Sequence, residues 1–440
     1  MNKKISVFVS IFLFMVSSGF SQRILHYSID SEGSLVVGGS TFVYDRYGDI
    51  DRTHTTVQNL EIPEYVEGRK VTGIAKKAFY DDSNIISVSI PKSISYIGPN
   101  AFNACRSIKS FYISPENPRY EVKGNLIVDK INSTLVSVFG DPVEIIIPDG
   151  IKEIPDNFFS DSDKLKKVTI PDSVTRIGER AFYEMYYIES INIPKNLEYI
   201  GDEAFCRCWA FSGDVDLSES LIYLGKAAFS ETRISSVKLP EHLTSIPEQV
   251  FAGCKSLKDI NFPKNLNSIE EFSLCGCSKL VDPKIPNTVE FIGNRAFEGI
   301  KFNVLKIPSG MKSIPKGAFY RISAEKIIFS SNIKMIEEEA FYNATIWSFT
   351  IPKSIESIGD RAFFECDIRT LTIENGIKSI GKHAFYHSNI YELILPDSIT
   401  FISPSAFELC SIGKLTVPSK LKTIPKAFSG CTITEETVIP

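Results

Sequence analysis

The chain has 440 residues, of which 43% are hydrophobic and 23% are charged, and its formal net charge is −5. These values are typical of a globular protein and exclude a disordered or fibrous chain. Weak acidity also makes nucleic acid or anionic lipid a poor match as the main partner.

The first 21 residues form a segment distinct from the rest. Lys3 and Lys4 precede an apolar run from Ile5 to Val16, and small residues then lead to Ser21. This order is typical of a secretory signal peptide, and its apolar core is short for a membrane span; an uncleaved anchor is the competing interpretation. We therefore expect a secreted or cell-surface protein, with the periplasm as a further option and no transmembrane segment in the mature chain.

Residues 22–60 lack the pattern that fills the remainder of the chain. They predict a β-rich N-terminal cap over the first repeat. The pair Gly38 and Gly39 predicts the position of its turn.

Residues 61–440 repeat one pattern about 15 times, at intervals of 21 to 24 residues apart from a step of 57 residues after Phe102. Each copy holds an alternating segment such as "LKDINFP", then Ile or Leu, and five residues later an aromatic residue that usually follows Ala. The alternation predicts a short half-buried strand, which Pro usually ends. We call the aromatic position the Phe slot; its occupants are Phe79, Phe102, Phe159, Phe182, Phe205, Phe229, Phe251, Leu274, Phe297, Phe319, Phe341, Phe363, Phe385, Phe407 and Phe428.

The repeat also indicates the fold class. A single copy cannot bury its own ring, whereas stacked copies can, because each strand pairs with those of its neighbours. The sequence therefore predicts a right-handed, mainly β solenoid of about 15 coils, with parallel stacked strands and the Phe slots in a buried column. Pro or acidic residues before the slot, as at Pro247 and Glu248, predict a short helical turn there.

The run "LKDINFPKNLNSIEEFSLCGCSKL" and its counterparts resemble the BspA-like leucine-rich repeat, whose pattern is close to L-x-x-I-x-I-P-x-x-V-x-x-I-G-x-x-A-F-x-x-C. The resemblance covers residues 61–440 and implies a leucine-rich-repeat solenoid. It also implies an association with bacterial surfaces and with adhesion to host matrix proteins or other bacteria. Residues 114–146 interrupt the repeat and look like an insertion common in that family; "NLIVDK" and "TLVSVF" predict a protruding hairpin there.

Seven of the nine cysteines lie three residues after the Phe slot, a position that small residues fill in other copies, which predicts buried thiols. Cys254 with Cys277, and Cys410 with Cys431, occupy adjacent coils within disulfide range, but their Cβ vectors are expected to run parallel, so pairing stays open. The Cys-x-Cys pairs 206/208 and 275/277 lack His at zinc spacing, and His383 and His387 lack the Glu of a zinc protease. We therefore predict no metal, no cofactor and no catalytic residue.

The residue after the Phe slot is aromatic in four consecutive coils. We call Tyr320, Tyr342, Phe364 and Tyr386 the aromatic stripe. Aligned rings either seal the flank of the core column or form a binding surface, since exposed aromatic residues make good hot spots. Outward strand positions such as Thr350, Thr372 and Ile394 show no charge bias and identify no ligand.

Three functions remain in order of preference. The first is a non-catalytic scaffold, secreted or at the cell surface, that binds a protein partner through an extended face. The second is a structural or envelope-organising protein that assembles through an open sheet edge. An exported enzyme comes third, because the sequence offers no nucleophile–base pair. The oligomeric state stays open.

Overall fold

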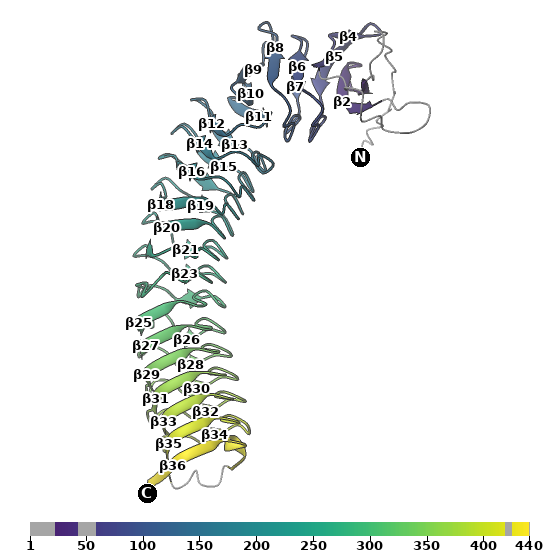
Figure 1. Cartoon of the computed structure of the whole chain (residues 1–440). Helices are drawn as coiled ribbons and strands as arrows, with labels where there is room; N and C mark the ends of the chain where they lie inside the picture. The colour runs from purple at the N-terminus through teal and green to yellow at the C-terminus, as the bar shows by residue number, and fades with distance from the viewer. Residues whose placement is uncertain (1–22, 43–58, 419–424, 440) are drawn as a thin grey trace, which may run out of the picture. The chain divides into compact units, whose positions relative to one another are not determined.

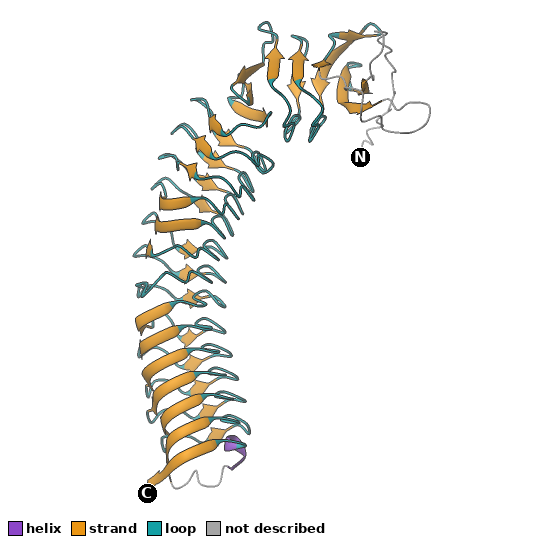
Figure 2. Ribbon diagram, viewed as in Figure 1, coloured by secondary structure: helices purple, strands orange, loops and turns teal. Residues whose placement is uncertain are grey.

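The computed structural model describes residues 23–42, 59–418 and 425–439; the expected signal peptide lies outside these ranges. The chain is a β-solenoid of about 16 turns with parallel stacked strands. The described residues fall into two compact units, one that ends at Asn196 and one that begins at Leu197. The one described helix is the 3-10 helix η2 (Pro425–Phe428), so strands and turns make up nearly all of both units (Figure 2).

The first unit begins with an antiparallel hairpin of β1 (Arg23–Ile29) and β2 (Leu35–Phe42). The chain reverses at Asp30, whose carboxylate accepts hydrogen bonds of 2.9 Å from the N–H groups of Glu32 and Ser34. The turn expected at Gly38 and Gly39 is therefore wrong. Both glycines lie inside β2, where the register shifts as at a β-bulge. A Cβ on Gly39 would lie 2.9 Å from the carbonyl oxygen of Ala78, which explains the glycine there.

Apart from the insertion, short strands from successive coils, nearly all parallel, build the rest of the described first unit (Figure 1). One set follows the alternating segments: β3 (Asn59–Glu61), β6 (Ser87–Ile90) and β8 (Ser110–Ile113), then β12 (Glu144–Ile146), β14 (Lys167–Thr169) and β16 (Ser190–Ile191). The other set ends at the Ile before the Phe slot: β5 (Arg69–Ile74), β7 (Tyr96–Ile97), β13 (Glu153–Ile154) and β15 (Arg176–Ile177), with β4 (Tyr65–Val66) antiparallel to β5.

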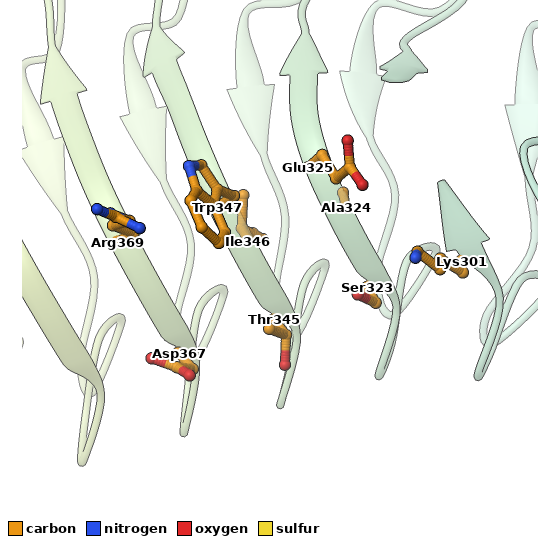
Figure 3. A pocket seen from close by; sticks show the side chains of 9 residues that line it. All are labelled: Lys301, Ser323, Ala324, Glu325, Thr345, Ile346, Trp347, Asp367 and Arg369. Atoms are coloured by element: carbon orange, nitrogen blue, oxygen red, sulfur yellow. The ribbon is translucent and has the colours of Figure 1, made fainter. Parts of the chain in front are cut away.

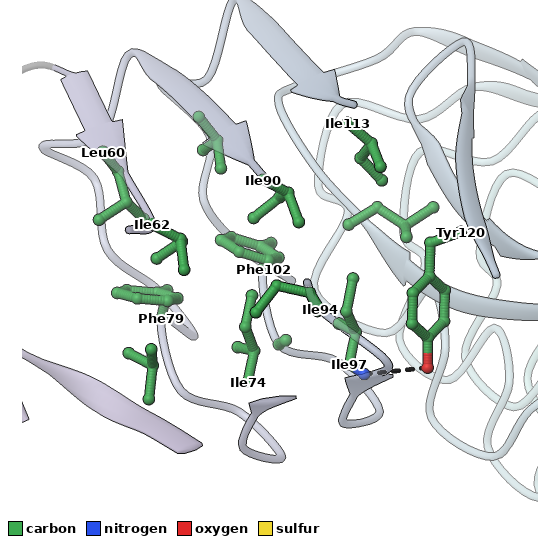
Figure 4. Packing of buried hydrophobic residues seen from close by; sticks show 14 of the residues in the cluster. Leu60, Ile62, Ile74, Phe79, Ile90, Ile94, Ile97, Phe102, Ile113 and Tyr120 are labelled. Carbon is green, nitrogen blue, oxygen red and sulfur yellow. Dashed lines mark hydrogen bonds between the residues drawn. The ribbon is translucent and has the colours of Figure 1, made fainter. Parts of the chain in front are cut away.

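The insertion is a three-stranded antiparallel sheet of β9 (Tyr120–Lys123), β10 (Leu126–Asp129) and β11 (Thr134–Val138). The predicted hairpin corresponds to β10 and β11, whereas β9 is an additional strand. The sheet does not protrude, because every residue of β10 is buried. The insertion also supplies hydrogen-bond acceptors that the following coil supplies elsewhere. The N–H of Phe102 donates to Ser137 Oγ at 2.9 Å. The N–H of Ile97 donates to the Tyr120 hydroxyl at 3.0 Å (Figure 4).

The second unit contains two runs of parallel strands. One run comprises β18 (Ser212–Asp216), β20 (Arg233–Lys238) and β22 (Asp259–Asn261), then the seven-stranded sheet of β25 (Lys301–Lys306), β27 (Ser323–Ile328), β29 (Thr345–Ile351), β31 (Asp367–Ile373), β33 (Asn389–Ile394), β35 (Ser411–Pro418) and β36 (Thr432–Ile439). We call this seven-stranded sheet the long sheet. The other run comprises β17 (Tyr199–Ile200), β19 (Tyr223–Leu224), β21 (Ser245–Ile246), β23 (Ser268–Ile269), β24 (Phe291–Ile292), β26 (Ser313–Ile314), β28 (Met335–Ile336), β30 (Ser357–Ile358), β32 (Ser379–Ile380) and β34 (Phe401–Ile402).

Apart from the last coil, where η2 contains Phe428, the turns that carry the Phe slot are not helical, which corrects the expected short helical turn. In the coil of Phe341, Glu339 and Asn343 have φ values of 57° and 53°, in the left-handed region. The N–H groups of Glu339, Phe341 and Asn343 donate to carbonyls of the following coil at 3.1, 2.8 and 2.7 Å. The intervening N–H groups bond back within the turn. This ladder between coils offsets the strain of two left-handed residues.

Candidate binding face

The Phe slots place their rings in the core of each unit. Within the first unit Phe79 and Phe102 stack at 5.2 Å between ring centroids (Figure 4). In the second unit Phe341, Phe363 and Phe385 stack at 5.1 and 5.0 Å with interplanar angles of 4° and 3°. The slot residues that are buried are Phe79, Phe102, Phe159, Phe182, Phe205, Phe229, Phe251, Leu274, Phe297, Phe319, Phe341, Phe363, Phe385 and Phe407, whereas Phe428 is half-buried.

The cysteines that follow the Phe slot are hydrogen-bond donors inside the core. None of the nine forms a disulfide. Cys366 Sγ donates to the carbonyl oxygen of Phe341 at 3.0 Å, and Ser388 Oγ makes the same bond to Phe363 at 2.8 Å in the next coil. Burial raises the pKa of Cys254 and of Cys366 to about 12, so both thiols stay protonated. Cys and Ser thus make equivalent bonds at this position, whereas other coils fill it with buried side chains that donate no hydrogen bond, such as Ile322 and Ala344.

The aromatic stripe is a second ladder of stacked rings. Tyr320 and Tyr342 lie 4.8 Å apart, and the next two steps, to Phe364 and Tyr386, measure 5.0 and 4.9 Å. Tyr320 is only 8% exposed, and the other three are half-buried. The guanidinium of Arg295 also lies 4.1 Å from the centroid of the Tyr320 ring. With their faces stacked on one another, these rings offer a partner little more than their edges.

The histidine pair lies in a surface turn. His383 Nε2 is 3.5 Å from a carboxylate oxygen of Glu408, and its ring contacts Tyr386 edge to face. Within residues 23–42, 59–418 and 425–439 no three His, Cys, Asp or Glu side chains are grouped as a metal site would require. The same ranges contain no helix long and apolar enough to cross a membrane.

The long sheet carries exposed aromatic residues at a point where its strands have two consecutive outward residues. In β25 two outward residues stand between the inward Phe302 and Leu305, and the neighbouring strands repeat this pattern. Register pairs the residues on both sides of the first outward residue across the sheet, which brings these first outward residues into one line. We call this line the bend row: Asn303, Glu325, Trp347, Arg369, Tyr391 and Gly413.

Trp347 and Tyr391 are the large apolar residues of the bend row, exposed by 59% and 70%. Arg369 lies between them, and its guanidinium carbon is 4.3 Å from the centroid of the Trp347 ring. An arginine over an indole face is attracted by the ring quadrupole, which favours this placement of both side chains. The row therefore presents a positioned aromatic–cation–aromatic set to solvent.

A groove of about 390 Å³ opens beside Trp347. Figure 3 shows Trp347 between Arg369 and Glu325, with Ser323 and Thr345 at the strand starts. Ala324 forms part of the floor, and it replaces the larger Phe302 and Ile346 that adjacent strands place in the same inward column. The remaining lining residues are Lys301, Ile346 and Asp367.

The sequence analysis did not predict the bend row, because its residues differ from the residue after the Phe slot and from the outward positions nearer the end of each strand. A signal was present: Trp347, Arg369 and Tyr391 each follow the Phe slot by six residues. Period-2 alternation assigns alternate residues to one face, and two consecutive outward residues break that rule.

The sequence matches the profile of the BspA type Leucine rich repeat region (6 copies) at residues 53–122, 141–258, 244–368 and 312–434. These matches cover most of the chain, which therefore belongs to the BspA-type leucine-rich repeat family. No curated protein gave a significant match.

Solved structures of leucine-rich repeat proteins resemble the chain at low identity. A leucine-rich repeat protein from Bacteroides ovatus is 21% identical, with 97% of this chain and 100% of that chain covered and a TM-score of 0.51. A leucine-rich repeat protein from Eubacterium ventriosum is 19% identical, with 64% and 95% covered and a TM-score of 0.44. A leucine rich cell surface protein from Faecalibacterium prausnitzii is 19% identical, with 96% of each chain covered and a TM-score of 0.30. The first of these similarities supports the fold.

Proposed function

We propose that the chain is a non-catalytic binding scaffold, secreted or displayed at the cell surface, that recognises a protein or glycoprotein of another surface through the long sheet. The observation that carries this proposal is the bend row. Trp, Tyr and Arg are the residues most enriched among binding hot spots, and Trp347, Arg369 and Tyr391 stand side by side and exposed. Export is supported by the predicted signal peptide at residues 1–21.

The solenoid suits this role because its rigidity comes from the core and leaves the outer positions free to vary. Columns such as Phe341 and Phe363 fix each strand of the long sheet relative to the next. A partner therefore meets a surface whose side chains are already positioned, which lowers the entropic cost of binding. The aromatic stripe supports binding less well, because its ring faces are stacked on one another.

Assembly through an open sheet edge finds less support. β36 is the last described strand of the long sheet, and Glu436 occupies its inward column in register with Leu415. The preceding strands fill that column with buried Phe349, Leu371 and Leu393. An inward-pointing charge on an edge strand disfavours addition of another strand.

Affinity capture with two matched triple variants tests the proposal. The full chain is used as bait against extracellular-matrix and bacterial-surface extracts. The variant Trp347→Ala, Arg369→Ala, Tyr391→Ala removes the bend-row hot spot. The control variant Phe291→Ala, Met335→Ala, Phe401→Ala removes exposed large side chains from the short strands of the same unit. We expect saturable binding that the first variant loses and the control keeps; equal binding by both variants would contradict the proposal.

A further inference from the structure

Several polar side chains that line the groove make no ion pair or side-chain hydrogen bond within the described part of the chain. Some other outward charges of the second unit do pair across strands, as Lys414 with Glu392 at 3.8 Å and Lys238 with Asp216 at 3.5 Å. Among the described residues, no ion pair or side-chain hydrogen bond engages Lys301, Glu325, Asp367 or Arg369, nor the hydroxyls of Ser323 and Thr345. The groove thus offers donors and acceptors that are available to a ligand.

The formal charges of the lining cancel. Lys301 and Arg369 supply two positive charges, and Glu325 and Asp367 supply two negative charges. A strongly anionic or cationic ligand would meet repulsion from one pair for every attraction from the other. A neutral ligand that both donates and accepts hydrogen bonds can use all four groups together with the Ser323 and Thr345 hydroxyls.

The indole supplies the apolar part of the site. The Arg369 guanidinium lies over the Trp347 ring, and Glu325, Ser323 and Lys301 line the groove on the opposite side of Trp347 from Arg369 (Figure 3). The negative face of an aromatic ring attracts weakly positive hydrogens. The C–H groups on one side of a pyranose ring meet that requirement, while the ring hydroxyls point to the surrounding polar groups.

We infer that the groove beside Trp347 binds a neutral sugar ring of a glycan. This inference rests on the proposed function, because it names the chemistry by which the long sheet holds its partner. The volume of about 390 Å³ lies at the small end of the range for ligand sites, about 300–1,000 Å³, and accommodates one or two sugar rings. A buried protein contact fits less well, since Lys, Glu, Asp and Ser are depleted from the cores of protein interfaces.

Tyr391 extends the site along the bend row. It lies two strands beyond Trp347, or about 10 Å at a strand spacing of about 4.8 Å. With 70% of its side chain exposed, it can stack on a second sugar of the same chain. The bound glycan is therefore an oligosaccharide that crosses the strands rather than one that runs along them.

Binding of defined saccharides to the full chain tests the inference. The probes are arrayed neutral oligomers of glucose, galactose, mannose and N-acetylhexosamine, followed by calorimetry on those that bind. We expect saturable binding that Trp347→Ala weakens about tenfold or more, with Glu325→Gln also weakened. Tyr391→Ala should reduce affinity for longer oligomers more than for monosaccharides. The control Phe401→Ala, which removes a 56% exposed ring from β34, should bind as the wild-type chain does.

Two outcomes overturn the inference. One is the absence of saturable binding to any of these saccharides, and the other is unchanged affinity in Trp347→Ala. Each variant must first show an unaltered unfolding midpoint, which its solvent exposure predicts. Enzymatic removal of glycans from a captured partner separates the two proposals. Capture that survives this treatment but is lost in Trp347→Ala supports the proposed function and defeats the sugar site, whereas no macromolecular binding through the long sheet defeats both.

Discussion

Glu436 of β36 lies in register with Leu415 of β35, at the end of a column that is otherwise apolar. The carboxylate is exposed, and burying it against a further strand would require desolvating an unpaired charge. Edge strands commonly avoid aggregation by such an inward charge. We therefore read Glu436 as the residue that limits strand addition to the long sheet.

Replacing Glu436 by Leu should allow this sheet edge to pair with a strand of another molecule. We expect Glu436→Leu to self-associate or precipitate as its concentration rises, because an apolar inward residue completes a pairing template. Sedimentation velocity over a concentration series measures the effect. The matched control is Glu435→Leu, which changes the neighbouring outward carboxylate, in register with Lys414. Similar association by both variants would mean that total charge, not the inward position, protects the edge.

Phe341 tests the buried column. Its ring is fully buried and stacks on Phe319 and Phe363 at 5.4 and 5.1 Å. Phe341→Ala should lower the free energy of unfolding by about 3–5 kcal/mol, the usual cost of truncating a buried aromatic residue. The shift in denaturant midpoint reports it. Lys353→Ala, at an exposed position in the same coil, should change stability by less than about 0.5 kcal/mol. Equal losses of stability in the two variants would contradict a special contribution of the stacked rings.

Tyr120 tests whether the insertion is part of the core. Its side chain is 2% exposed, and its hydroxyl accepts the N–H of Ile97 at 3.0 Å. Tyr120→Phe keeps the ring but leaves that buried N–H without its acceptor, so stability should fall by about 1–3 kcal/mol. Amide hydrogen exchange should also quicken at Ile97. The control Tyr112→Phe alters a 56% exposed ring and should leave both quantities unchanged; a matching loss there would point to a general effect of removing hydroxyls.

The buried thiols predict a loss of stability at alkaline pH. Burial raises the pKa of Cys254 from 9.0 to about 12 in the folded chain. As pH rises above 9, the unfolded chain loses this proton first, so folding is disfavoured by up to about 1.4 kcal/mol per pH unit for each such thiol. Below pH 9 both states keep the proton and the effect vanishes.

Chemical denaturation of the wild-type chain and of Cys254→Ser at pH 8 and pH 10 measures this effect. The variant should lose less stability than the wild-type chain between the two pH values, because Ser does not ionise there. Ser388→Ala changes the equivalent position in another coil without removing a thiol and should retain the wild-type pH dependence. An identical pH dependence in all three proteins would show that the pKa of Cys254 does not differ between the folded and the unfolded chain.

The sequence by itself determined the repeat, its inward columns and the family. Residues such as Ile358 and Phe363 recur at a fixed interval, as Ile380 and Phe385 do in the next coil. They recur because only stacked coils can bury them, and this requirement leaves a pattern along the chain. The same logic placed the thiols inside. It did not reveal that Cys366 donates to the Phe341 carbonyl, since that bond joins residues from different coils.

Tertiary structure alone decided the backbone of the turn, the depth of the insertion and the bend row. The left-handed residues at positions such as Glu339 are stabilised by bonds to the next coil, not by local propensity, so the local signal suggested a helix instead. Trp347 and Arg369 lie 22 residues apart and meet only because strand register aligns them. The need for burial constrains the inward positions of every copy, so the repeat period reveals them. Which outward residues become neighbours depends on strand register between copies, and the repeat period does not reveal it.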